Sequence, residues 1–91
     1  MPWLKTRQLD ASAQAWAEHL SRTNSFHHSS ANVYENIAFS TADPNRAFAQ
    51  WRNSPGHNAN MLGNATQVGI GAAHAYVAGY GWGFIVVMQA K

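Results

Sequence analysis

His57 is the residue with the clearest chemical potential, because its neighbours predict an unusual setting for an imidazole. Ser54 followed by Pro55 is a typical helix start: the hydroxyl accepts a backbone N–H, and the proline ring suits the first helical position. Gly63 suits the left-handed residue that ends a helix, so we expect a short helix from about Pro55 to Leu62. The positive end of the helix dipole disfavours an imidazolium, and a neutral imidazole can bind a metal or act as a base.

The composition indicates one small globular domain over residues 1–91. Hydrophobic residues make up 46% of the chain and aromatic residues 12%, which excludes a disordered protein. Only 11% of the residues are charged, so the surface must consist largely of uncharged polar groups, which defend weakly against association. The basic residues are scattered, and a net charge of +2 does not indicate a nucleic-acid-binding surface.

Other compositional features exclude several classes of site. The chain has no cysteine, which excludes disulfides, thiolate metal sites and a cysteine nucleophile. The longest apolar run, residues 84–88, is far too short to span a bilayer. Residues 1–7 lack the apolar segment of a signal peptide, so the sequence taken literally predicts a cytosolic protein unless a leader has been removed.

Hydrophobic periodicity predicts the helices that must position these groups. Asp10 is expected as the N-cap of an amphipathic helix that ends near Arg22, with residues 1–8 forming a lead-in loop. Residues 33–39 predict a short strand or extended segment, and residues 43–51 predict a second helix. The positions of the first helix expected to face outward are Gln14, Glu18 and Ser21.

The C-terminal third predicts an antiparallel hairpin. Residues 66–76 alternate as a strand should, residues 78–81 have turn chemistry, and residues 82–89 form a second, mostly apolar strand. Gly69 and Gly71 leave one face of the first strand bare, which suits the close approach of another backbone or a packed helix. Helices beside a small, largely antiparallel sheet make an α+β fold.

The aromatic and remaining histidine residues have ordinary structural interpretations. We expect Trp16, Trp51 and Trp82 in the core, and Trp3 and Tyr80 exposed where they can contact a ligand. His27 is expected to be exposed, His19 half-buried, and His74 either buried or exposed without a ligand role.

Four short motifs in a fixed order resemble one protein family. They are His28-Ser29, Glu35-Asn36-Ile37-Ala38, the Trp51–Leu62 stretch containing Ser54-Pro55-Gly56-His57 and Asn60, and Val68-Gly69-Ile70-Gly71. In this order they resemble the bacterial branch of the CAP superfamily, the cysteine-rich secretory, antigen 5 and pathogenesis-related proteins. The resemblance implies an α-β-α sandwich with a cleft lined by histidines and acidic residues. It also implies an extracellular or cell-envelope location.

The same resemblance assigns the cleft residues by position. His28 and His57 match the two histidines and Glu35 matches an acid, whereas Ser54 stands where eukaryotic members usually have a second acid. Two imidazoles and one carboxylate suit zinc or another divalent cation, with a coordination position open for water. Two asparagines are expected to support this site through hydrogen bonds to nearby backbone, namely Asn36 and Asn60.

Three functions are compatible with these residues. The first is a binding module whose cleft holds a divalent cation and an apolar (sterol or lipid) or glycan-like cell-wall ligand. The second is a metal-dependent hydrolase using His28, Glu35 and His57. We favour it less than a structural role, in which Glu35 accepts hydrogen bonds from His28 or His57, because the sequence has no second acid and no recognised nucleophile. A serine triad is not indicated either, because Ser29 and Ser30 lack the glycine pattern of a nucleophile elbow. The third is a structural fragment: the family's usual first helix is absent, so we expect an N-terminally truncated sandwich that forms homo-oligomers through the uncovered face.

Overall fold

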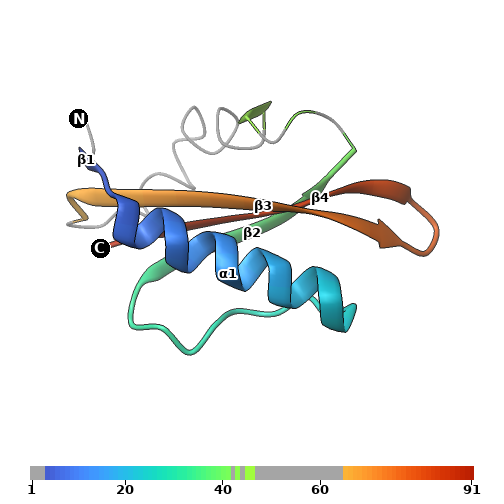
Figure 1. Ribbon diagram of the computed structural model, residues 1–91, viewed down its shortest axis with the longest axis horizontal. Coiled ribbons are helices and arrows are strands. Elements are labelled where there is room, and N and C mark those ends of the chain that lie inside the picture. Colours follow the sequence, from blue (N-terminus) through green and yellow to red (C-terminus); the bar gives the residue numbers. More distant parts are fainter. Residues whose placement is uncertain (1–3, 42, 44, 47–64) are drawn as a thin grey trace.

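The computed structural model describes residues 4–41, 43, 45–46 and 65–91 (Figure 1). The helix predicted over residues 55–62 lies outside the described residues, as do Trp3, Trp51 and most of the helix predicted over residues 43–51. In chain order the elements are β1 (Leu4–Lys5), α1 (Arg7–Thr23), β2 (Tyr34–Ser40), β3 (Gln67–Val77) and β4 (Gly81–Ala90).

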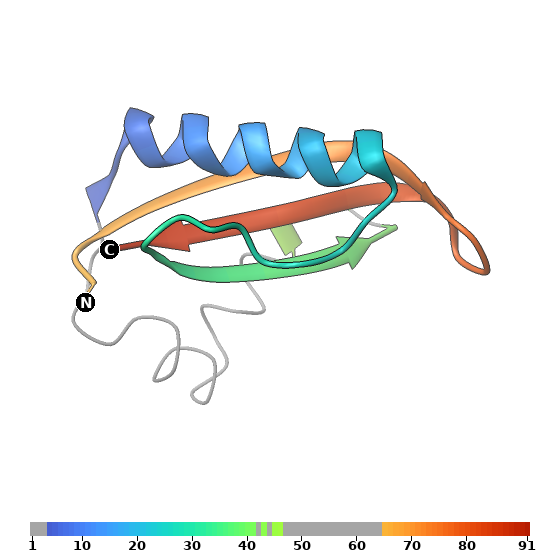
Figure 2. The ribbon, with the colours of Figure 1, turned by 90° about the horizontal axis from the view of Figure 1, so that it is seen from below.

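The four strands form one mixed sheet in the order β1-β3-β4-β2. β1 is parallel to β3, whereas β3–β4 and β2–β4 are antiparallel, so the prediction of a largely antiparallel sheet is confirmed. β3 and β4 form the predicted hairpin, whose turn uses Gly79 and Gly81 at φ values of +90°. α1 lies across one face of this sheet (Figure 2), which gives the expected α+β architecture.

Glycine residues in β3 allow α1 to pack directly on the strand. A Cβ atom added to Gly69 would lie 2.1 Å from the backbone carbonyl carbon of Leu9, and one added to Gly71 would lie 2.3 Å from the backbone nitrogen of Gln14. The predicted close approach at these two glycines is therefore confirmed. This close packing lets α1 form one buried core with the central strands β3 and β4. The core consists of Ala13, Ala17, Leu20, Ala75, Ile85 and Val87.

The start of α1 differs from the prediction. The N-cap is Thr6, whose hydroxyl accepts from the backbone N–H of Leu9 at 3.2 Å, and residues 4–5 form a strand in place of a loop. Asp10 instead lies in the first helical turn, where its carboxylate accepts from the backbone N–H of Ile70 at 3.0 Å and from Lys5 at 2.6 Å. These contacts connect the helix to the sheet, and they hold the pKa of Asp10 below its ordinary 3.8 although burial raises it.

Polar residues of α1 also protect the edge of β3 beyond the short strand β1. The Gln14 amide accepts from the Ala72 N–H at 2.9 Å and donates to the Ala72 carbonyl at 2.8 Å. The Ser21 hydroxyl donates to the carbonyl of His74 at 2.7 Å. The expectation that Gln14 and Ser21 face outward is therefore wrong, because both satisfy backbone groups that would otherwise be an open strand edge.

The face of the hairpin away from α1 carries exposed rings near the turn. Trp82 pairs across the strands with Tyr76, and their ring centroids are 5.5 Å apart. Trp82 is 64% exposed, so its predicted core position is wrong: it stands on the face opposite α1, near the hairpin turn. His74 is exposed and lies 5.0 Å from the Trp82 ring. On the same face, a second buried cluster forms nearer the other end of the sheet from Val68, Val86 and Met88.

Candidate functional site

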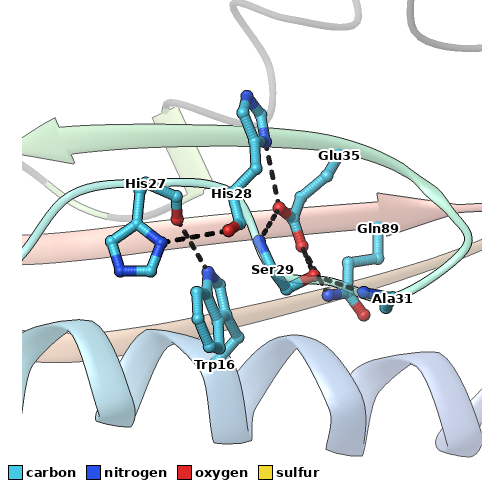
Figure 3. Close-up of polar contacts among 7 residues, drawn as sticks. All are labelled: Trp16, His27, His28, Ser29, Ala31, Glu35 and Gln89. Atoms are coloured by element: carbon cyan, nitrogen blue, oxygen red, sulfur yellow. Dashed lines mark hydrogen bonds and ion pairs between the residues drawn. The ribbon is translucent and has the colours of Figure 1, made fainter.

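Glu35 is the centre of the candidate site (Figure 3). It lies near the start of β2, opposite Gln89 of the central strand β4, and only 4% of its side chain is exposed. Oε1 accepts from the Ser29 backbone N–H at 2.8 Å and from His28 Nδ1 at 3.0 Å. Oε2 accepts from the Ser29 hydroxyl at 2.6 Å and from Gln89 Nε2 at 2.7 Å. Both carboxylate oxygens are therefore held by two donors each.

These donors determine the ionisation of Glu35. Burial raises its pKa, but the hydrogen bonds from Ser29, Gln89 and His28 outweigh burial and hold the pKa below the ordinary 4.5. At neutral pH Glu35 is thus an ionised carboxylate, which can only accept hydrogen bonds. The site therefore contains a buried negative charge that is stabilised entirely by neighbouring donors.

The ionised carboxylate fixes the tautomer of His28. Since Glu35 can only accept, His28 Nδ1 must carry the proton of the 3.0 Å hydrogen bond. In the neutral imidazole, Nε2 then has the free lone pair. The His28 side chain is 68% exposed, so this lone pair is accessible to a metal ion or a proton. Chemically, the pair is an exposed base with a buried carboxylate behind it.

α1 holds the loop that carries His28. Trp16 Nε1 donates to the backbone carbonyl of His27 at 3.0 Å, and the two rings meet edge to face at 5.2 Å. His27 Nδ1 in turn donates to the carbonyl of His28 at 3.1 Å. His27 is exposed and His19, which stacks on Trp16 at 4.8 Å, is half-buried, as predicted. The position of His28 therefore depends on both the sheet and the helix.

Ser29 and Gln89 are structural partners that complete the site. The Ser29 hydroxyl donates to Glu35 and accepts from the Ala31 N–H at 3.3 Å, so it is fully used in holding the loop. Gln89 is 1% exposed, although the sequence pattern predicts only the end of an apolar strand there and no role in the site. A buried polar residue at the end of such a strand was the available signal, because it requires a partner.

The structure brings together two of the predicted ligands. His28 and Glu35 are in contact, whereas His57, Ser54 and Asn60 lie outside the described residues. Within the described ranges, no group of three or more His, Cys, Asp or Glu side chains could hold a metal ion. Two buried side-chain atoms have no hydrogen-bond partner in the described part of the chain, Asn36 Nδ2 and Gln89 Oε1.

Comparison with known proteins agrees with this architecture. No helix among the described residues is both long and apolar enough to cross a membrane. Among solved structures, the chain is similar to an outer surface protein from Borrelia burgdorferi, with a TM-score of 0.62 and 18% identity. That alignment covers 100% of this chain and 78% of the Borrelia protein, and at this identity it shows a shared fold.

The family comparison covers nearly the whole sequence. None of the curated proteins compared with the chain matches it. Residues 6–89 match the CAP family, described as the cysteine-rich secretory protein family. This range includes α1, the His28–Glu35 pair and the β3–β4 hairpin. The resemblance seen in the sequence motifs is confirmed, and the chain belongs to the CAP, or cysteine-rich secretory protein, family.

Proposed function

We propose that this CAP domain is a binding module in which His28 and His57 hold a divalent cation, with zinc the best fit to two imidazoles. The observation that carries the proposal is the buried Glu35 carboxylate, which fixes His28 with Nδ1 protonated and Nε2 available. Carboxylates commonly stand behind metal-binding histidines in this way, fixing the tautomer and raising the basicity of the ligand.

Glu35 is best assigned to orient His28 in this proposal. Direct coordination would require its oxygens to lose some of the bonds from Ser29, Gln89 and His28. A bound zinc ion would polarise a coordinated water, which is the chemistry that a hydrolase would need. The Ser29 hydroxyl and the Glu35 carboxylate are engaged with each other, so neither is free to act on a substrate. The described residues therefore support cation binding better than catalysis.

The location and organic ligand belong to the same proposal. The similar Borrelia protein is an outer surface protein, which supports a place in the cell envelope or outside the cell. There the cleft would take an apolar ligand, such as a sterol or lipid, or a cell-wall glycan. We also propose the layered α-β-α arrangement, because Val68, Val86 and Met88 are buried on the face away from α1.

Self-association is a second candidate property. The exposed Tyr76 and Trp82 rings on the face away from α1 favour it, since large apolar groups on a surface with few charges promote contact between copies. Light scattering across a concentration series would show a rise in mass that Trp82→Ser reduces. A constant monomeric mass at high concentration would exclude it.

A thermal melt with and without zinc tests the cation site. Excess zinc, at about 100 times Kd, stabilises the folded state by about 2.7 kcal/mol. For a domain of this size that raises Tm by roughly 10–20 °C. We expect the rise in the metal-stripped wild type and in the control His74→Ala, whose ring lies on the opposite face of the sheet. His28→Ala and His57→Ala should lose it. No rise in the wild type, or an equal rise in His28→Ala, would refute the site.

A further inference from the structure

A pocket of about 540 Å³ lies at the other end of α1 from its N-cap, between the end of β2 and the β3–β4 turn. Its floor consists of apolar core residues, Leu20, Ala75 and Ile85. Phe39 of β2 forms part of the wall. Phe39 is four residues from Glu35, or about 13 Å along an extended strand, so the pocket is separate from the histidine site.

The side chains around the pocket determine which ligands it can accept. None of the lining residues carries a charge at neutral pH. A charged ligand would lose hydration there without gaining an oppositely charged partner, which is costly. Asn24, Ser25 and Thr41 supply uncharged hydrogen-bonding groups among the lining residues. The pocket therefore suits a neutral molecule with one polar end, and its volume is in the range of small-molecule sites.

Aromatic side chains line the pocket beside this apolar floor. Phe26 is 58% exposed and Tyr80 is 74% exposed, which is unusual for two large rings that line one cavity. Tyr80 lies edge to face with Phe39, with ring centroids 6.1 Å apart. Tyr76 also lines the pocket, but its ring pairs with Trp82 on the face away from α1. The other three rings favour a flat aromatic ligand, because offset and edge-to-face ring contacts add to the gain from apolar burial.

We propose that this pocket binds an uncharged, planar aromatic molecule of two or three rings. The rings of Phe26, Phe39 and Tyr80 contact its faces and edges, and the polar residues receive its hydrogen-bonding end. The exposure predicted for Tyr80 from the sequence is confirmed, and its place in the pocket gives that exposure a use. This inference goes beyond the proposed cation site and does not depend on it.

A fluorescence titration with N-phenyl-1-naphthylamine, a neutral ring compound, tests the proposal on the whole chain. We expect saturable one-to-one binding that zinc and His28→Ala leave unchanged. The matched probe 1-anilinonaphthalene-8-sulfonate adds a negative charge to the same rings and should bind at least about ten-fold more weakly, because no cationic side chain lines the pocket. A long-chain aliphatic alcohol should compete poorly. Equal binding of the sulfonate or the alcohol would overturn the assigned ligand class.

Variants and chemical shifts locate the bound probe. Phe26→Ser and Tyr80→Ser remove exposed rings and should each weaken binding about three- to ten-fold. Tyr34→Ser also removes an exposed ring, but Tyr34 does not line the pocket, so this variant should bind like the wild type. Amide NMR signals from residues 24–26 and 77–80 should shift on binding. Loss of binding in a control variant, or shifts confined to other segments, would overturn the pocket assignment.

Discussion

Replacing Glu35 tests whether its carboxylate holds the His28 loop on the sheet. In Glu35→Ala, Ser29, Gln89 and His28 lose their shared acceptor in a site where the side chain was only 4% exposed. Hydrogen bonds to a charged group contribute about 1.5–3 kcal/mol each, and buried donors without an acceptor add a further penalty. Loop movement lets some donors reach water, so we expect a loss of about 4 kcal/mol in the free energy of unfolding.

Glu35→Gln should cost less, for a reason visible in the hydrogen-bonding pattern. If the new amide nitrogen takes the place of Oε2, the Ser29 hydroxyl can rotate to accept from it. Gln89 can turn its own amide to present Oε1, which has no hydrogen-bond partner among the described residues. The contacts are then conserved and only the charge is lost. We expect about 2 kcal/mol, or roughly half the effect of the alanine variant.

Urea unfolding followed by tryptophan fluorescence measures both variants. The matched control is Glu18→Ala, since Glu18 is an exposed glutamate of α1 whose carboxylate lies 3.4 Å from Gln14. A surface change of this kind should stay within about 0.5 kcal/mol. If Glu35→Ala also cost less than about 1 kcal/mol, the carboxylate would not be what holds the loop, and the assignment of His28 would lose its support.

Three further predictions concern pH and packing. Because the folded-state pKa of Glu35 is below the ordinary 4.5, the ionised carboxylate contributes its full stabilisation above pH 4.5 and loses it as the pH falls through the folded pKa. Unfolding free energies measured at decreasing pH should therefore converge for the wild type and Glu35→Gln. Gln14→Leu leaves the N–H and the carbonyl of Ala72 without their partner, so the free energy of unfolding in urea should fall by about 1–3 kcal/mol. An unchanged stability would show that water replaces the amide. Gly71→Ala forces a methyl group against α1 and should lower the free energy of unfolding by about 3 kcal/mol or more. In the control Gly79→Ala the new methyl group meets open space, so the loss should be only about 1–2 kcal/mol, from the positive φ. Similar melting temperatures for the two variants would contradict the close packing.

The parts of the fold that follow from local patterns were predictable from the sequence. The hairpin and α1 have clear periods of two and 3.6 residues, and Gly69 and Gly71 indicated the packed face correctly. β1 was missed because two residues are too few to show a period, and its parallel pairing joins it to residues more than sixty positions away.

The errors in the site and the cap have the same physical origin. Thr6 and Asp10 are both suitable N-cap types, and only the contact of Asp10 with Ile70, sixty residues away, decides between them. Likewise, the motif around Glu35 could be recognised, but the identity of its donors could not. Gln89 reaches Glu35 from 54 residues away, through a strand register that no local pattern specifies.

The arrangement of donors also changes how the acidic residue should be understood. A conventional acid–base site needs a carboxyl group that can exchange a proton near neutral pH, whereas the hydrogen bonds at Glu35 keep its pKa low and its charge buried. The group with an accessible ligand position is therefore His28, and Glu35 acts through it. α1 supports both proposed binding sites. Trp16 holds the loop of His28, while Leu20 and the C-cap residue Asn24 line the aromatic pocket. A helix packed tightly on two glycines is thus the element on which both proposed binding sites depend.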